Sequence, residues 1–156
     1  MSQYLSVLTE EEKEFLYQVP ARAVILVGGA DDDFDDLERK TAEELAKTKT
    51  YTSNEELQCY FTEVSGRLLQ DVDALMAGYP TEAKDRNPKI REELRNVNSV
   101  LDKIDGHFTD GFTDAIIEIA RYVAESSGGV LGFLSVSKTE EKALCNLTKI
   151  LKEYSY

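Results

Sequence analysis

The feature that most constrains the fold is a stripe of apolar residues that recurs every three or four positions through the middle of the chain. Its members are Leu57, Phe61, Val64, Leu68, Val72 and Leu75. An α-helix brings residues at this spacing onto one face, whereas a half-buried β-strand requires alternation at every second position. Ser53 and Glu56 form a capping pair before the stripe, and Gly78 and Pro80 follow it. The pattern therefore predicts one long amphipathic helix that ends near Gly78.

Similar stripes fill the N-terminal part of the chain, where no segment alternates with period two. Thr9 with Glu12, and Asp35 with Glu38, form further capping pairs that predict helix starts. Between them, Pro20 lacks a backbone donor, so we expect the first helix to kink or restart there. The apolar run after this proline predicts a helical segment that is buried on most sides.

The C-terminal part shows the same helical spacing. Asn87 before Pro88 predicts the start of a fifth helix, because proline suits the first turn. The glycines of segment 105–111 predict a break, after which a sixth helix begins near Phe112. A last Ser/Thr-x-x-Glu box predicts a final helix that starts at Ser137. The expected fold is all-α, a single bundle of about seven helices.

Charge and composition narrow the classes of partner. The chain has 30 Asp and Glu against 18 Lys and Arg, a formal net charge of −12. This charge repels nucleic acid and anionic lipid, and it favours cations or basic proteins. No stretch approaches the roughly 20 apolar residues of a membrane span, and the N-terminus resembles no leader. We expect one cytoplasmic domain over residues 1–156, with no nucleic-acid binding and no direct membrane insertion.

Cys59 and Cys145 are the two cysteines, and each lies within a helical pattern. Neither has a Cys or His neighbour at the spacing of a metal site. Because unpaired cysteines are commonly buried, we expect two free thiols packed in the interior, in a reducing compartment.

Segment 24–38 joins an apolar run to an acidic turn. Its six acids are Asp31, Asp32, Asp33, Asp35, Asp36 and Glu38. Carboxylate ligands suit Ca²⁺, Mg²⁺ or Mn²⁺, although the EF-hand spacing fails, with Asp36 at its glycine position and Ala42 at its closing glutamate. Acids also stabilise the N-terminus of a helix. The residues therefore leave two interpretations open, a divalent-cation site and a helix cap.

This segment resembles the first signature of the TerB-like (tellurite-resistance protein B) helical domains, Ala-Asp-Gly-x-Val/Ile-x-x-x-Glu. The matching residues are Ala30, Asp31, Phe34 and Glu38, while Asp32 stands where the family has glycine. The resemblance implies a helical bundle in which the acidic turn holds a divalent cation.

Asp105 and Gly106 resemble the Asp-Gly signature that these domains carry in their second half. Phe112 stands where the closing glutamate would be, so Asp110 or Asp114 would have to replace it. The metal ligands that the resemblance implies are Asp31, Asp33, Asp35, Glu38, Asp105 and Asp110. From the residues alone, the same stretch predicts a glycine turn, with Asp110 capping the next helix.

Two functions of different classes remain. The resemblance implies a non-enzymatic TerB-like binding domain of a stress-response or membrane-associated assembly, with Ca²⁺, Mg²⁺ or Mn²⁺ in its acidic turns. The net charge favours instead an inhibitor or scaffold domain that binds a basic protein without metal. His107, the one histidine, is expected to be an exposed turn residue. No motif brings together a nucleophile, a base and an orienting group, so an enzyme is the weakest interpretation.

Overall fold

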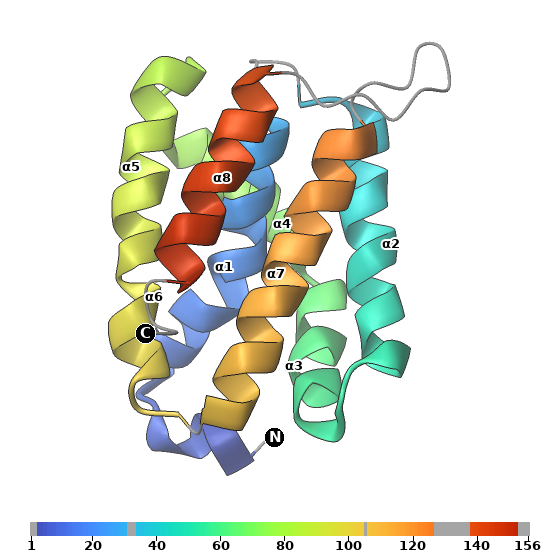
Figure 1. The fold of residues 1–156 in the computed structure, drawn as a ribbon, viewed down its shortest axis with the longest axis vertical. Helices are drawn as coiled ribbons and strands as arrows, with labels where there is room; N and C mark the ends of the chain where they lie inside the picture. Colours follow the sequence, from blue (N-terminus) through green and yellow to red (C-terminus); the bar gives the residue numbers. More distant parts are fainter. Residues whose placement is uncertain (1–2, 31–33, 105, 127–137, 153–156) are drawn as a thin grey trace.

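The computed structural model describes residues 3–30, 34–104, 106–126 and 138–152, and this part of the chain is all-α (Figure 1). The elements are η1 (Gln3–Val7), α1 (Glu10–Gly28), α2 (Asp36–Thr52), α3 (Glu55–Ser65), α4 (Leu68–Gly78), α5 (Ala83–Arg95), α6 (Val97–Leu101), α7 (Gly106–Ser126) and α8 (Lys138–Lys152). The predicted all-α bundle is confirmed. None of the described helices is long and apolar enough to cross a membrane.

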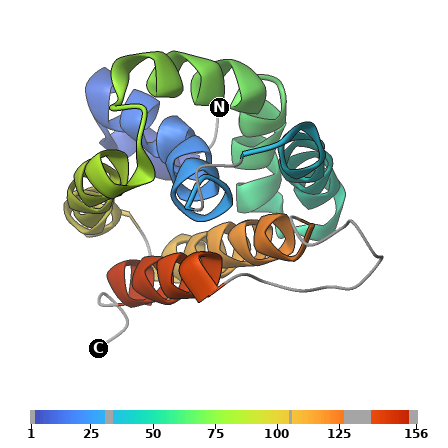
Figure 2. The same ribbon diagram turned by 90° about the horizontal axis from the view of Figure 1, so that it is seen from above.

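Helix α1 is the centre of the bundle. It packs against α4, α5, α7 and α8, and Figure 2 shows it enclosed between them. Every residue from Val19 to Ala30 is buried, as the apolar run predicts. Helices α7 and α8 lie side by side along one edge, and α5 and α2 flank α1 on opposite sides (Figure 2). Burial of its apolar run against four helices is what holds α1 at the centre.

Helix α1 continues through Pro20, so the predicted restart is wrong. Proline lacks the N–H that would donate to the carbonyl of Leu16, four residues earlier. The hydroxyl of Tyr60, on α3, donates to that carbonyl instead, at 2.6 Å. Because another helix supplies the missing donor, the chain need not leave the helical path.

The predicted long helix after Ser53 is two helices, α3 and α4, separated at Gly66 and Arg67. Arg67 has φ −135° and ψ −5°, outside the helical range, and its guanidinium binds Glu14 on α1 and Asp71 on α4. Glycine weakens the helix at this point, and the break lets α3 pack on α2 while α4 packs on α1. The apolar stripe stays buried through Val72.

Helix α5 begins at Ala83, ahead of the predicted start at Asn87, and it carries Pro88 inside it. The reason is Arg86, which is 2% exposed and ties the first turn to the rest of the bundle. Its guanidinium donates to the carbonyls of Thr81 and Gly29, at 2.8 Å each. These contacts stabilise the turn that precedes the proline.

The predicted break before α7 exists but lies earlier than predicted, because α6 ends at Leu101 and α7 already begins at Gly106 and includes Gly111. A side chain at Gly111 would place its Cβ 2.6 Å from Cδ1 of Leu57. Glycine therefore serves close packing of α3 on α7, and an interior glycine is tolerated at a modest cost in helix stability.

Cys59 and Cys145 are free, as predicted, but both are exposed. The expectation that they pack in the interior is wrong, because each lies off the buried stripe of its helix. The buried residues that flank Cys59 on α3 are Leu57, Tyr60 and Phe61, and those that flank Cys145 on α8 are Ala143 and Leu147.

Candidate functional site

The acidic turn before α2 is only partly described, because Asp31, Asp33 and Asp105 lie outside the described residues. Asp35 is the N-cap of α2. Its Oδ1 accepts from the N–H of Glu38 at 2.8 Å, and its own N–H donates to Oε1 of Glu38 at 3.3 Å. The capping interpretation is therefore confirmed for this pair, and the cation interpretation stays a prediction.

Glu38, in the first turn of α2, is fully buried, 0% exposed. A Cβ on Gly28 would lie 3.0 Å from its Oε2 and 2.7 Å from two ring carbons of Phe34. The end of α1 must therefore be glycine for the start of α2 to approach it this closely.

Asp110 lies far from this turn. It is exposed in the second turn of α7, and its backbone carbonyl accepts from Oγ1 of Thr113 at 3.2 Å. The starts of α2 and α7 are at opposite ends of the bundle (Figure 1). Asp110 and the Asp35–Glu38 pair therefore do not form one site. Across the described ranges, no three His, Cys, Asp or Glu side chains group as metal ligands. His107 is exposed, as predicted, but in the first turn of α7.

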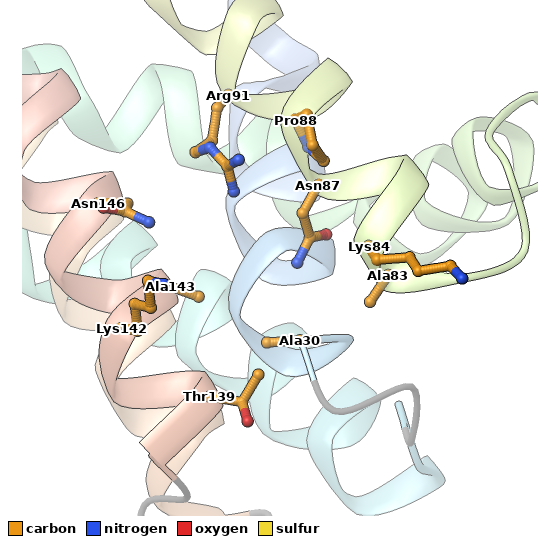
Figure 3. A pocket seen from close by; sticks show the side chains of 10 residues that line it. All are labelled: Ala30, Ala83, Lys84, Asn87, Pro88, Arg91, Thr139, Lys142, Ala143 and Asn146. Carbon is orange, nitrogen blue, oxygen red and sulfur yellow. The ribbon is translucent and has the colours of Figure 1, made fainter.

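A hollow of about 380 Å³ opens between α5 and α8, beside the end of α1 (Figure 3). Its lining residues are Ala30, Ala83, Lys84, Asn87, Pro88, Arg91, Thr139, Lys142, Ala143 and Asn146. None of these residues, which all belong to the described part of the chain, is acidic. The alanines leave the space open because their side chains end at Cβ.

Hydrogen-bond donors point into this hollow. Figure 3 shows the guanidinium of Arg91 and the amide nitrogens of Asn87 and Asn146 directed into the space between the two helices. Asn87 is only 9% exposed, and its Oδ1 has no hydrogen-bond partner within the described part of the chain. A half-buried space that presents donors without acceptors of opposite charge is suited to bind an anion.

A second hollow of about 200 Å³ adjoins the first along the same two helices. It shares Arg91 and Asn146 with the first, and adds Arg95, Lys149 and Ile150. We call the two hollows together the α5–α8 groove. It carries three basic residues from α5 and two from α8, namely Lys84, Arg91, Arg95, Lys142 and Lys149.

Four of these five cations have no carboxylate within 4.0 Å among the described residues. The exception is Lys84, which lies 3.2 Å from Glu82 in an exposed pair. Most cations on the other helices are paired, for example Lys49 with Glu118, although Arg121 on α7 has no carboxylate within 4.0 Å among the described residues. The positive charge of the groove is therefore left available, although the chain as a whole is strongly negative.

Helix α5 is held against the bundle by the face opposite to these cations. Nε of Arg22 on α1 lies 3.0 Å from Oε2 of Glu93, and the hydroxyl of Tyr79 donates to the same oxygen. Burial, and then the hydrogen bond to Glu93, raise the pKa of Tyr79 to about 12. On the other wall, Nδ2 of Asn98 donates to the carbonyl of Ile150 at 3.3 Å. These contacts fix both walls of the groove.

A third hollow, of about 430 Å³, lies between α7 and α8 and has mixed charge. Asp114, Glu118 and Glu125 line it together with Arg121 and Lys152. Asp114 forms an ion pair with Lys152 there. Acids beside the cations make this hollow a poorer anion site than the α5–α8 groove.

The groove was missed from the sequence because the net charge pointed to the opposite sign of partner. A weak signal was present, since Lys84 and Arg91, and likewise Lys142 and Lys149, are seven residues apart and share a helix face. Nothing in the sequence indicated that these two faces meet.

Comparison of the chain with protein-family models, with curated proteins and with solved structures finds no match. The TerB-like identity accordingly remains a prediction from the residues of the acidic turn.

Proposed function

We propose that this chain is a non-enzymatic binding domain that recognises an acidic segment of a partner protein in the α5–α8 groove. The observation that carries the proposal is that Arg91, Arg95, Lys142 and Lys149 lie together without carboxylate partners among the described residues. Arg91 is half-buried, whereas Arg95, Lys142 and Lys149 are exposed. Hydrogen bonds in which both groups are charged are among the stronger polar contacts that a protein can offer.

A protein segment fits the groove better than nucleic acid does. The net charge of −12 repels a long polyanion, whereas a short acidic segment is attracted locally, because salt screens charges beyond about 8 Å. Among the described residues that line the groove, none is an aromatic residue on which bases could stack. Electrostatic recognition of a few carboxylates is therefore the function that this geometry supports best.

The test is binding of a fluorescein-labelled, glutamate-rich peptide, followed by fluorescence anisotropy. We expect saturable binding that weakens as salt is raised, and Arg91→Gln should weaken it about tenfold, the effect of one ionic hydrogen bond. Arg121→Gln is the matched control, because it removes the same charge from the α7–α8 hollow. Equal affinities for the two variants would contradict the proposal.

A second proposal is that the turn between α1 and α2 binds a divalent cation, as the TerB-like resemblance implies. The observation that favours it is the buried carboxylate of Glu38, placed at the turn that contains Asp31 and Asp33. Calorimetric titration of Ca²⁺, Mg²⁺ and Mn²⁺ into chelator-treated protein tests it. Saturable heat at high salt that Asp31→Asn abolishes, and Asp110→Asn leaves intact, is the expected result, and no such heat would refute the proposal.

The alternative of a basic protein partner has a separate test. Association driven by the net charge should be fast and should fall steeply with ionic strength. Partners recovered from the native host that are the same at low and high salt would argue against it.

A further inference from the structure

We infer that the α5–α8 groove contains two carboxylate subsites one helical turn apart, and that it selects an extended peptide with the sequence acid-x-acid. This inference rests on the proposed function and specifies its ligand. The first subsite is formed by Asn87, Arg91 and Lys142, and the second by Arg95 and Lys149, with Arg91 at the boundary of both.

The first subsite is shaped for the end of an acidic side chain. The guanidinium of Arg91 presents a planar set of donors, which matches the two oxygens of a carboxylate. The Asn87 amide nitrogen faces the same space, and this leaves its Oδ1 buried without a partner in the described structure (Figure 3). Ala83 and Ala143 supply an apolar wall for the methylene groups of the ligand side chain.

The second subsite repeats this arrangement one turn further along. Arg95 follows Arg91 by four residues on α5, and Lys149 follows Asn146 by three on α8. Helices α5 and α8 lie side by side and run in the same direction (Figure 1). One turn further along α5 is therefore also one turn further along α8. The two subsites are thus offset by about 6 Å, four residues at 1.5 Å each.

This offset selects the spacing of acids in the ligand. In an extended chain, residues i and i+2 point to the same side and lie about 6.6 Å apart, whereas residues i+1 and i+3 point away. The two hollows offer about 380 and 200 Å³. An extended acid-x-acid segment therefore fits both subsites at once.

The test uses three labelled peptides of equal charge, with Glu-Ala-Glu, Glu-Glu-Ala or Glu-Ala-Ala-Glu cores between Gly-Ser flanks. We expect the Glu-Ala-Glu peptide to bind about tenfold more tightly than the other two, since only it uses both subsites. Arg95→Gln should remove this preference and leave weak binding at the first subsite. Arg121→Gln should change neither affinity nor preference, as it lies outside the groove.

A neutral change, Ala143→Leu, separates the groove from a general effect of charge, and an isosteric change, Asn146→Asp, tests it further. Ala143→Leu should fill the first hollow and abolish binding without altering the charge. Asn146→Asp should place a carboxylate beside Arg91 and compete with the ligand. Circular dichroism and the melting temperature identify any variant that fails to fold, and in that case the other variant decides.

The outcomes also separate this inference from the function on which it rests. Equal affinity for the three peptides, with all binding still lost in Ala143→Leu and Asn146→Asp, overturns the two-subsite inference and keeps the groove as an anion site. Affinities that no groove variant changes overturn both. Calorimetric binding of inorganic phosphate without any peptide binding identifies a small-anion site and overturns the peptide ligand. Tighter binding of a single-stranded oligonucleotide than of any peptide overturns the choice of a protein partner.

Discussion

Replacing Tyr60 with phenylalanine should test how α1 passes through Pro20 without a break. The Tyr60 hydroxyl is buried and donates to the carbonyl of Leu16 at 2.6 Å. Because Pro20 has no N–H, that carbonyl loses its usual donor within the helix. Phenylalanine removes the hydroxyl and leaves the carbonyl buried and unpaired.

The expected loss of stability is about 1 to 3 kcal/mol, the usual cost of a buried polar group that loses its partner. Packing should contribute little to this loss, because phenylalanine keeps the ring. The ring of Tyr60 meets those of Phe61 and Phe112 edge-on, with centroids 5.0 and 5.4 Å apart. The change in unfolding free energy therefore reports mainly the hydrogen bond.

A double-mutant cycle with Pro20→Ala sharpens the test. Alanine restores an N–H that can donate to the carbonyl of Leu16, so it should recover about 1 kcal/mol or more when Tyr60 is phenylalanine. When Tyr60 is intact, the same change should not raise stability, because the carbonyl already has a donor. Loss of proline also raises the conformational entropy of the unfolded chain, which disfavours folding. The two substitutions should therefore be strongly non-additive.

The measurement is urea-induced unfolding, followed by circular dichroism, for the wild type, both single variants and the double variant. Tyr17→Phe is the control, since Tyr17 stacks on Tyr60 at 5.6 Å but has no hydroxyl hydrogen bond in the described structure. Its effect should stay within about 0.5 kcal/mol. A Tyr60→Phe variant as stable as this control, or additive effects of the two substitutions, would refute the reasoning.

Three other outcomes are expected. The pKa of Tyr79 is raised to about 12, so its contribution to stability is present below pH 10.0, its unfolded value, and is lost as the pH rises to about 12. In Tyr79→Phe, the unfolding free energy measured against pH should no longer fall between pH 10.0 and about 12. An unchanged profile would show that the hydroxyl that binds Glu93 is not the cause of this loss. Gly28→Ala should lower stability by about 1 to 3 kcal/mol in thermal unfolding, because its Cβ would lie 2.7 Å from ring carbons, and a neutral effect would show that the ring moves freely. Cys59 and Cys145 are exposed, so both should react with a thiol reagent in the native protein at rates close to those in urea, and protection of either would contradict its placement.

The helical class and the core could be predicted from the sequence. Residues such as Phe61 and Val72 recur at helical spacing, and they are buried because a helix aligns them on one face. The capping pairs of Thr9 with Glu12 and of Asp35 formed as predicted, since capping is a local interaction between residues three apart. The predicted pair of Ser53 and Glu56 is wrong, because Asn54 caps α3 and its Oδ1 accepts from the N–H of Leu57.

Helix boundaries that depend on other helices were predicted wrongly. Proline predicted a restart at Pro20, but Tyr60 supplies the missing donor from α3. The stripe predicted one long helix, but Arg67 binds Glu14 on α1, and the helix divides beside Gly66. In each case a contact between distant residues outweighed a local preference of about 1 to 3 kcal/mol.

The candidate site depends even more on contacts between distant residues than the helix boundaries do. The net charge of −12 is fixed by the sequence, and it favoured a cation or a basic partner. Which charges remain unpaired depends on neighbours in space. Only packing of α5 beside α8 brings Arg91 and Lys142 to one hollow, where no described lining residue is acidic. The sequence by itself determined the helices, the core and the total charge. The tertiary structure decided where the surface of this negatively charged chain is locally positive. The reason is that ion pairing acts over a few ångströms, between residues that can be about fifty positions apart in the sequence.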